Sequence, residues 1–181
     1  QKVLYTENSV LLFTASSTGA MEAAVTNLVA KRCLNLVNGA FSKRWHEITL
    51  GNGVPCDAFE IPWDTAIKPE MVDAQLRTGK YDAVALVFNE TSTGLMNPLQ
   101  AIAEVVRQYP DVYLLVDAVS GMAGAKIDTD AWGIDYVLAG VQKAFALPPG
   151  LAVAAVSARA LERARHVPPR SFYFNLPDMY K

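Results

Sequence analysis

The sequence has little of what marks several classes of protein. It contains only two cysteines, Cys33 and Cys56, which match no metal-site spacing and cannot build a disulfide framework. No apolar run approaches the length of a membrane span, and the chain does not open on the basic and then apolar segments of a secretory signal. We therefore expect a cytoplasmic protein with no metal site and no membrane partner.

The sequence also has a small net charge and no nucleotide-binding loop motif. The formal net charge of −2 gives no electrostatic reason to expect a nucleic-acid partner. There is no internal repeat, G-x-G-x-x-G loop or Walker-type loop, so a plain nucleotide- or Mg²⁺-binding domain is the weakest alternative. Apolar residues make up 51% of the chain, enough for one domain or a large one with an appendage. The chain opens on Gln1 and ends at Lys181 with no closing helix, so we expect a piece of a longer polypeptide.

What the sequence does contain is a regular alternation of strands and helices. Apolar runs predict strands over 10–13, 33–37, 57–61, 82–88, 112–116, 134–138 and 151–156. Helical patterns lie over 20–30, 41–48, 68–77, 99–109 and 158–165. This order predicts an α/β protein, a three-layer sandwich around a mostly parallel sheet. The loop before the seventh strand is too short for a crossover helix, so that strand is predicted to run antiparallel.

A hydroxyl-rich turn, TASSTG over residues 14–19, follows the first strand and precedes a helix. Free backbone N–H groups and the helix dipole make such a turn a site for anions. The alternative is that Ser17 or Thr18 only caps the helix. Taken alone, the turn favours the capping interpretation.

Lys143 lies between two apolar runs, in the segment IDYVLAGVQKAFALPPGLAV. Burial there would lower the pKa of its amine and make the amine a nucleophile, although an exposed loop lysine is the commoner case. Its setting favours the first interpretation, because Thr91 and Asp117 also follow predicted strands directly. In open α/β sheets, ligands bind at this carboxyl edge of the strands.

An anion-binding turn, a carboxylate and a lysine are together the groups that pyridoxal 5'-phosphate requires from a protein. The turn would take the phosphate, the carboxylate would pair with the pyridine nitrogen, and the lysine would form the Schiff base. Asp117 alone could equally be a helix N-cap or a Mg²⁺ ligand.

Four segments, TASSTGAMEAAVTNL, NETSTGLMNPL, LLVDAVSGMAG and IDYVLAGVQKAFALPPG, resemble the class V aminotransferases of the fold-type-I pyridoxal-phosphate enzymes. Within that class the chain is most similar to the alanine–glyoxylate and serine–pyruvate aminotransferases. The resemblance implies that residues 1–181 form the large, cofactor-binding domain, with a seven-stranded sheet whose last strand is antiparallel. The N-terminal segment and the small C-terminal domain of the family are then absent from this chain.

The resemblance also implies roles for individual residues. Lys143 corresponds to the Schiff-base lysine and Asp117 to the partner of the pyridine nitrogen. The implied phosphate contacts are Ser16, Ser17, Thr18 and Gln142. The other implied cofactor contacts are Phe41 and Val119 on the two ring faces and Thr91 near the phenolic oxygen. Val141 departs from the small or hydroxyl residue usual before Gln-Lys, and its bulk is expected to weaken the phosphate contacts.

Together these features predict a homodimeric aminotransferase that uses pyridoxal phosphate, an alanine- or serine-like amino acid and a glyoxylate- or pyruvate-like 2-oxo acid. A lyase or desulfurase of the same fold is one alternative, but Cys33 and Cys56 lie away from the strand ends that build the site. A non-catalytic cofactor-binding fragment is another, because the family's substrate-carboxylate arginine lies in the small domain. Three arginines are interpreted instead as helix-surface and loop charges: Arg159, Arg163 and Arg170.

Overall fold

The computed structural model describes residues 2–181 and contains a seven-stranded sheet with the order β1-β9-β8-β7-β4-β2-β3. The strands are β1 (Ser9–Phe13), β2 (Cys33–Val37), β3 (Cys56–Glu60), β4 (Ala83–Val87), β7 (Tyr113–Asp117), β8 (Tyr136–Gly140) and β9 (Ala152–Val156). Neighbouring strands from β8 to β3 are parallel, whereas β9 is antiparallel to both β8 and β1. The prediction of a mostly parallel sheet with an antiparallel last strand is confirmed.

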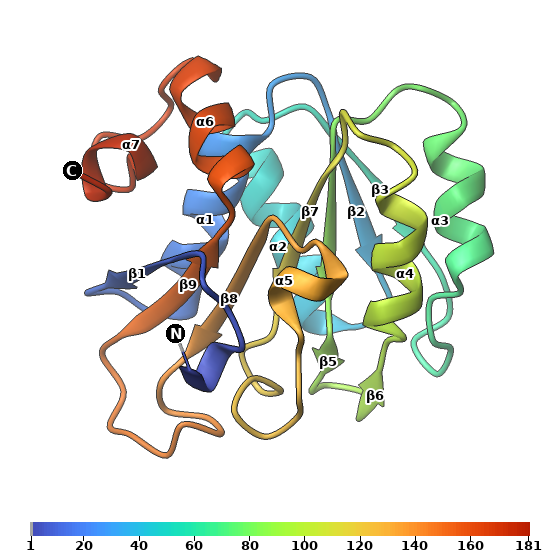
Figure 1. Cartoon of the computed structure of the whole chain (residues 1–181). Helices are drawn as coiled ribbons and strands as arrows, with labels where there is room; N and C mark the ends of the chain where they lie inside the picture. Colours follow the sequence, from blue (N-terminus) through green and yellow to red (C-terminus); the bar gives the residue numbers. More distant parts are fainter. Residues whose placement is uncertain (1) are drawn as a thin grey trace.

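Helices cover both faces of this sheet (Figure 1). One face carries α3 (Pro69–Leu76), α4 (Leu99–Val106) and the short α5 (Thr129–Trp132). The other carries α1 (Ser17–Leu28), α2 (Ala40–Gly51) and α6 (Ala158–His166). The apolar runs of the strands are continuous because both faces of the sheet are covered. In β7, Leu114 and Val116 pack on the first face and Leu115 packs on the second. Burying such a leucine contributes about 2–3 kcal/mol, so both faces stabilise the sheet.

Several short elements escaped the sequence patterns. They are the 3₁₀ turn Lys2–Leu4, the hairpin of β5 (Asn89–Glu90) and β6 (Leu95–Met96), α5, and α7 (Leu176–Met179). The expectation of no closing helix is wrong, because Asn175 caps α7 by accepting from the backbone N–H of Asp178. Elements of two to four residues are too short to show a period of 2 or 3.6.

Arg159 and Arg163 lie on α6 and Arg170 in the loop that follows it, as interpreted, but each also makes a contact within the fold. Arg159 on α6 pairs with the buried Asp135, at 2.5 Å from Nε to Oδ1, and Arg163 pairs with Asp82. Arg170 donates to the carbonyl of Val29 at 2.6 Å. Both aspartates precede buried strands, and a buried carboxylate requires a partner of this kind.

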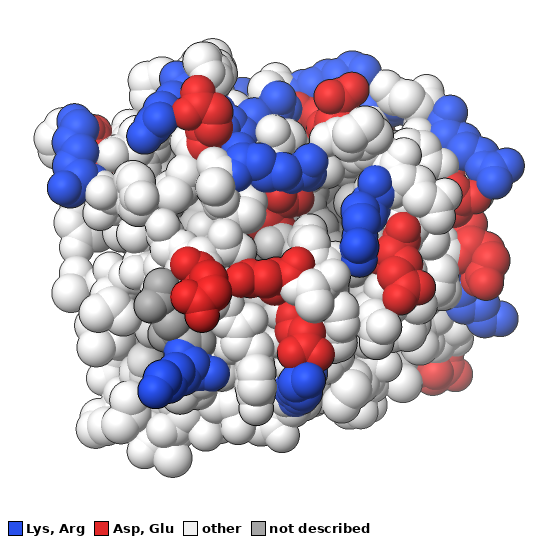
Figure 2. All heavy atoms as spheres, viewed as in Figure 1, with Lys and Arg blue, Asp and Glu red and all other residues white. Residues whose placement is uncertain are grey.

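Acidic and basic side chains lie interspersed over the face of the molecule shown in Figure 2. Within residues 2–181, no helix combines the length and apolar content needed to cross a membrane.

Candidate active site

A pocket of about 230 Å³ lies where the carboxyl ends of β4, β7 and β8 meet the first turns of α1 and α2. We call it the carboxyl-end pocket. All the residues predicted to bind the cofactor line it: Ser16, Ser17, Thr18, Phe41, Thr91, Asp117, Val119, Gln142 and Lys143. Four further residues complete the lining: Met21, Arg44, Asn89 and Ser120. Segments far apart in the sequence thus converge because parallel strands end at one edge.

The serine-rich turn forms the wall at the start of α1. Ser16 is the N-cap residue, yet its side chain makes no capping hydrogen bond. The Ser17 hydroxyl oxygen is buried and has no hydrogen-bond partner among residues 2–181. The capping interpretation of Ser17 is therefore wrong, and the turn offers unused donors next to a helix N-terminus, as an anion site does.

Gly140, the last residue of β8, keeps this wall open. A Cβ atom there would lie 2.5 Å from the Ser17 hydroxyl oxygen and 2.7 Å from Gln142 Oε1. A larger residue would have to displace the Ser17 or Gln142 side chain from its place over the strand end. The two polar groups therefore form a small cradle.

Asp117 ends β7 at the base of the pocket and is 3% exposed. Its Oδ1 accepts a hydrogen bond of 2.8 Å from the backbone N–H of Val119, and no lysine or arginine of the described residues pairs with it. Burial raises the pKa of Asp117 to about 7, the Val119 N–H opposes this rise, and the charge of Glu90 adds to it. Asp117 can therefore bind a cationic group of a ligand as its counterion.

Lys143 follows β8 and lies at the edge of the pocket, in the loop over 141–151. The expectation that burial activates this lysine is wrong, because its side chain is exposed. The loop turns away from the sheet, and most of residues 142–151 are exposed with it. The ammonium group pairs with no carboxylate in the part of the chain that the structure describes.

The two aromatic residues of α2 have different environments. Phe41 in the first turn is 39% exposed and lines the pocket, whereas Trp45 is 1% exposed in the core and donates to the Met21 carbonyl at 3.2 Å. Val119, predicted on the other ring face, also lines the pocket. Val141 is 4% exposed and packs in the core instead of lining the pocket. Its bulk therefore does not face the phosphate contacts, contrary to expectation.

A second polar group without a partner lies beside Thr91. The Thr91 hydroxyl lies 2.9 Å from that of Ser120, which donates to the Asn89 carbonyl at 3.3 Å. Asn89 Oδ1 is buried with no partner. We did not predict Asn89, Ser120, Met21 or Arg44. Two of these residues could have been predicted. Asn89 is polar and directly follows a predicted buried strand, and Arg44 lies one helical turn after Phe41.

Comparisons with known proteins agree with this geometry. The family described as Aminotransferase class-V matches residues 1–181. An uncharacterised aminotransferase of Methanocaldococcus jannaschii is 40% identical, over 90% of this chain and 43% of its own length. The protein named soluble hydrogenase, small subunit, of a Synechococcus species is 36% identical, over 94% and 46%. The structure of an alanine–glyoxylate aminotransferase from a Nostoc species superimposes with a TM-score of 0.93 at 30% identity, over 99% and 49%. The chain spans about half the length of these relatives.

Class V aminotransferases are pyridoxal-phosphate enzymes, and the residues of the pocket fit that cofactor. The cradle of Ser17 and Gln142 over Gly140 suits an anion. The buried Asp117 suits a cationic ring nitrogen, and Lys143 supplies an exposed amine at the pocket edge. With a family match over its whole length and a pocket that fits the family's cofactor, the chain belongs to the class V aminotransferases.

Proposed function

We propose that this chain is the large, cofactor-binding domain of a homodimeric, cytoplasmic aminotransferase that uses pyridoxal phosphate. The proposed amino acid is small, alanine- or serine-like, and the proposed 2-oxo acid is glyoxylate- or pyruvate-like. One observation carries the proposal: the only two buried side-chain N or O atoms without a partner, within residues 2–181, both lie in the pocket with Lys143 and Asp117. The name of the Nostoc structure supports the substrate class.

The start of α1 is proposed to hold the cofactor phosphate. Ser17 brings its unpartnered hydroxyl, and Ser16, Thr18 and Gln142 bring further polar groups. The first N–H groups of this 12-residue helix have no intrahelical partner, and its dipole favours negative charge. Phosphate binding would satisfy donors that the protein alone leaves unused.

Asp117 is proposed to face the ring nitrogen. When bound, the cofactor supplies an aldehyde that combines with amines and a ring that withdraws electrons from the carbon beside the amine nitrogen. Asp117 favours a proton on the ring nitrogen, because an ion pair there relieves the burial of its own charge. Phe41 and Val119 are proposed to hold the ring between them, and Thr91 to contact its phenolic oxygen.

Lys143 is proposed to have two tasks. Its amine would hold the cofactor covalently by condensing with the aldehyde and releasing water, and the free amine would carry a proton to and from the carbon that bears the substrate amine. Its exposed position in the loop after β8, free of ion pairs with the described residues, leaves it room to do both.

Neither cysteine of this chain suits a desulfurase. Cys33 and Cys56 are the first residues of β2 and β3, and they are buried at the amino edge of the sheet. The pocket lies at the opposite edge. This observation favours transamination over sulfur chemistry.

The test is an absorbance spectrum of the protein with pyridoxal phosphate, followed by borohydride reduction and intact-mass measurement. We expect a visible band and, after reduction, a covalent mass increase of one cofactor, both absent in Lys143→Ala and retained in the exposed control Lys43→Ala. Parallel assays would compare alanine with glyoxylate against sulfide release from cysteine. Sulfide release without amino transfer would overturn the proposed activity.

A further inference from the structure

Glu90 is a buried carboxylate just behind the carboxyl-end pocket and is not one of its lining residues. It lies in β5, between Asn89 and Thr91, which do line the pocket, and its side chain is 0% exposed. No lysine, arginine or histidine within residues 2–181 forms an ion pair with it. A buried carboxylate without a counterion needs another source of stabilisation.

The start of α2 provides that stabilisation. Glu90 Oε2 accepts from the Ser42 backbone N–H and from the Ser42 hydroxyl, each at 2.9 Å. Oε1 accepts from the Phe41 N–H at 3.2 Å and from the Ser92 hydroxyl at 2.6 Å. The N-cap residue, Gly39, has no side chain, so Glu90 satisfies the first N–H groups of the helix in its place.

The hydrogen bonds keep this carboxylate charged. Burial raises the pKa of Glu90, but the hydrogen bonds from Ser92, Ser42 and the Phe41 N–H together outweigh burial, so the pKa lies below its ordinary value. Near neutral pH the site behind the pocket therefore holds a negative charge.

The Glu90 side chain packs closely against Gly39 at the start of α2. A Cβ atom on Gly39 would lie 2.2 Å from Glu90 Cγ and 2.8 Å from the Ser92 hydroxyl oxygen. Its φ of 175° is extended backbone that any residue adopts, so the close approach of Glu90 is what excludes a side chain. The position of α2, and of Phe41 in its first turn, is thereby tied to Glu90.

Glu90 is fully buried between two lining residues of the pocket that Asp117 also lines, so its negative charge lies near that carboxyl and helps to raise the pKa of Asp117. Two like charges close together in a buried site repel each other, and both attract a cation placed beside them. The other charged groups that line the pocket are Arg44 on α2 and Lys143 after β8.

We propose that Glu90 is a positioning residue of the cofactor site: its carboxylate fixes Phe41 through the start of α2, and its negative charge adds to that of Asp117 in holding a protonated ring nitrogen. This inference rests on the proposed function. Glu90 would thus act in two ways, through the position of Phe41 and through its negative charge. Different substitutions can disturb each of the two.

The test uses the full-length protein with pyridoxal phosphate. Glu90→Gln removes the charge and replaces one of the two acceptor oxygens by an NH₂ donor. Ser42→Ala removes one hydroxyl donor, and Gly39→Ala crowds the carboxylate while keeping its charge. Glu104→Gln, on the exposed face of α4, is the control with the same change in charge. Three quantities are measured: the dissociation constant of pyridoxal phosphate, the pH at which the visible band of the bound cofactor changes, and the unfolding midpoint of the protein without cofactor.

We expect Glu90→Gln to weaken cofactor binding about tenfold or more and to move the spectral transition about half a pH unit or more to lower pH, since a cation loses a nearby negative charge. Ser42→Ala and Gly39→Ala should weaken binding severalfold and leave the transition pH unchanged. Glu104→Gln should change neither.

A Glu90→Gln protein with the wild-type dissociation constant and transition pH, but a lower unfolding midpoint, would overturn the inference and leave Glu90 a residue of the fold alone. If Glu90→Gln does not fold, unchanged cofactor binding in both Ser42→Ala and Gly39→Ala would overturn it. Failure of the wild-type protein to bind pyridoxal phosphate would instead overturn the proposed function itself.

Discussion

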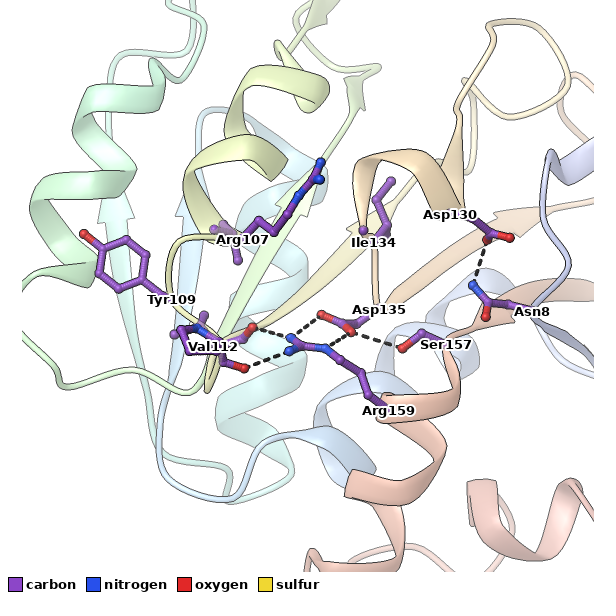
Figure 3. A pocket seen from close by; sticks show the side chains of 12 residues that line it. Asn8, Arg107, Tyr109, Val112, Asp130, Ile134, Asp135, Ser157 and Arg159 are labelled. Carbon is purple, nitrogen blue, oxygen red and sulfur yellow. Dashed lines mark hydrogen bonds and ion pairs between the residues drawn. The ribbon is translucent and has the colours of Figure 1, made fainter.

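The two edges of the sheet each carry a hollow, and the two differ in how their polar groups are satisfied. The hollow at the amino edge, which we call the amino-end hollow, is the larger, at about 430 Å³ against 230 Å³. Figure 3 shows its central carboxylate, Asp135, which accepts from Arg159 at 2.5 and 2.9 Å and from Ser157 at 3.1 Å. Asp135 also accepts from the Leu114 N–H at 2.9 Å.

In the carboxyl-end pocket, by contrast, the buried polar side chains have few hydrogen bonds. Asp117 accepts from one N–H, and the polar oxygens of Ser17 and Asn89 have no partner. In a folded protein, buried polar groups are normally hydrogen-bonded, so their partners here are expected from outside the chain. The smaller hollow is therefore the better candidate for ligand binding, because its unused donors and acceptors, and not its volume, set it apart from the amino-end hollow.

Removing the central carboxylate of the amino-end hollow should have the largest effect on stability. Asp135→Ala leaves the Leu114 N–H without its acceptor and Arg159 without its carboxylate, although Arg159 still donates to the carbonyls of Pro110 and Val112. The loss should cost about 3–5 kcal/mol of unfolding free energy, nearer the lower value because Arg159 keeps these bonds and is 45% exposed. Urea unfolding measures the loss, with the exposed Asp111→Ala as control. Affinity for pyridoxal phosphate should stay unchanged in the folded protein. A cost below about 1 kcal/mol would contradict the structural role of Asp135.

Removing the carboxylate of the carboxyl-end pocket, Asp117, should instead stabilise the cofactor-free protein. The folded-state pKa of Asp117 is about 7 against an ordinary 3.8, so its ionisation destabilises the fold as pH rises from about 4 to about 7. Asp117→Asn should therefore stabilise the cofactor-free protein at pH 8 by about 2–4 kcal/mol and have no such effect at pH 4.

The measurement is urea unfolding of the cofactor-free protein at both pH values, with the dissociation constant of pyridoxal phosphate measured in parallel. Asp117→Asn should weaken cofactor binding at least tenfold, because the ring nitrogen loses its counterion. Destabilisation at pH 8 would show that Asp117 is paired within the protein, and the contrast between the two edges would fail.

Two serines at helix starts give the smallest and most closely matched contrast. Ser157 caps α6 by accepting from the Ala160 N–H at 3.1 Å, whereas Ser17 at the start of α1 has no partner. Ser157→Ala should cost about 1 kcal/mol of stability and leave cofactor binding intact. Ser17→Ala should leave cofactor-free stability within about 0.5 kcal/mol of wild type and weaken cofactor binding about tenfold. Equal stability losses in the two variants would show that the Ser17 hydroxyl is satisfied within the protein.

Much of the fold and of the site could be predicted, for one physical reason. Strands buried on both faces have continuous apolar runs, and polar residues that follow such runs meet at one edge of a parallel sheet. That is why Asp117, Thr91 and Lys143 were found together. The resemblance to the class V aminotransferases added Phe41 and Val119, whose side chains carry no chemical signal of their own.

What escaped prediction depends on contacts distant in the sequence. The exposure of Lys143 follows from the path of a loop, and the burial of Asp135 and Asp82 follows from helix α6 packing over the amino edge. Glu90 lies in a two-residue strand that no periodicity shows, and its partners on α2, Phe41 and Ser42, are about fifty residues earlier in the chain. Val141 faces the core because the chain bends after β8, a direction that residue type does not specify.

Strand β1 leads directly into the serine-rich turn, and the strand that it pairs with is β9, with Ser9 opposite Val156 and Phe13 opposite Ala152. During synthesis the ribosome makes the proposed phosphate-binding turn before β9, so the strand that leads into the turn lacks its β9 partner until residues 152–156 have emerged. Pairing over so large a sequence separation is slow to form. The nascent chain should therefore acquire the ability to capture pyridoxal phosphate only after residue 156 has left the exit tunnel, and then in a single step.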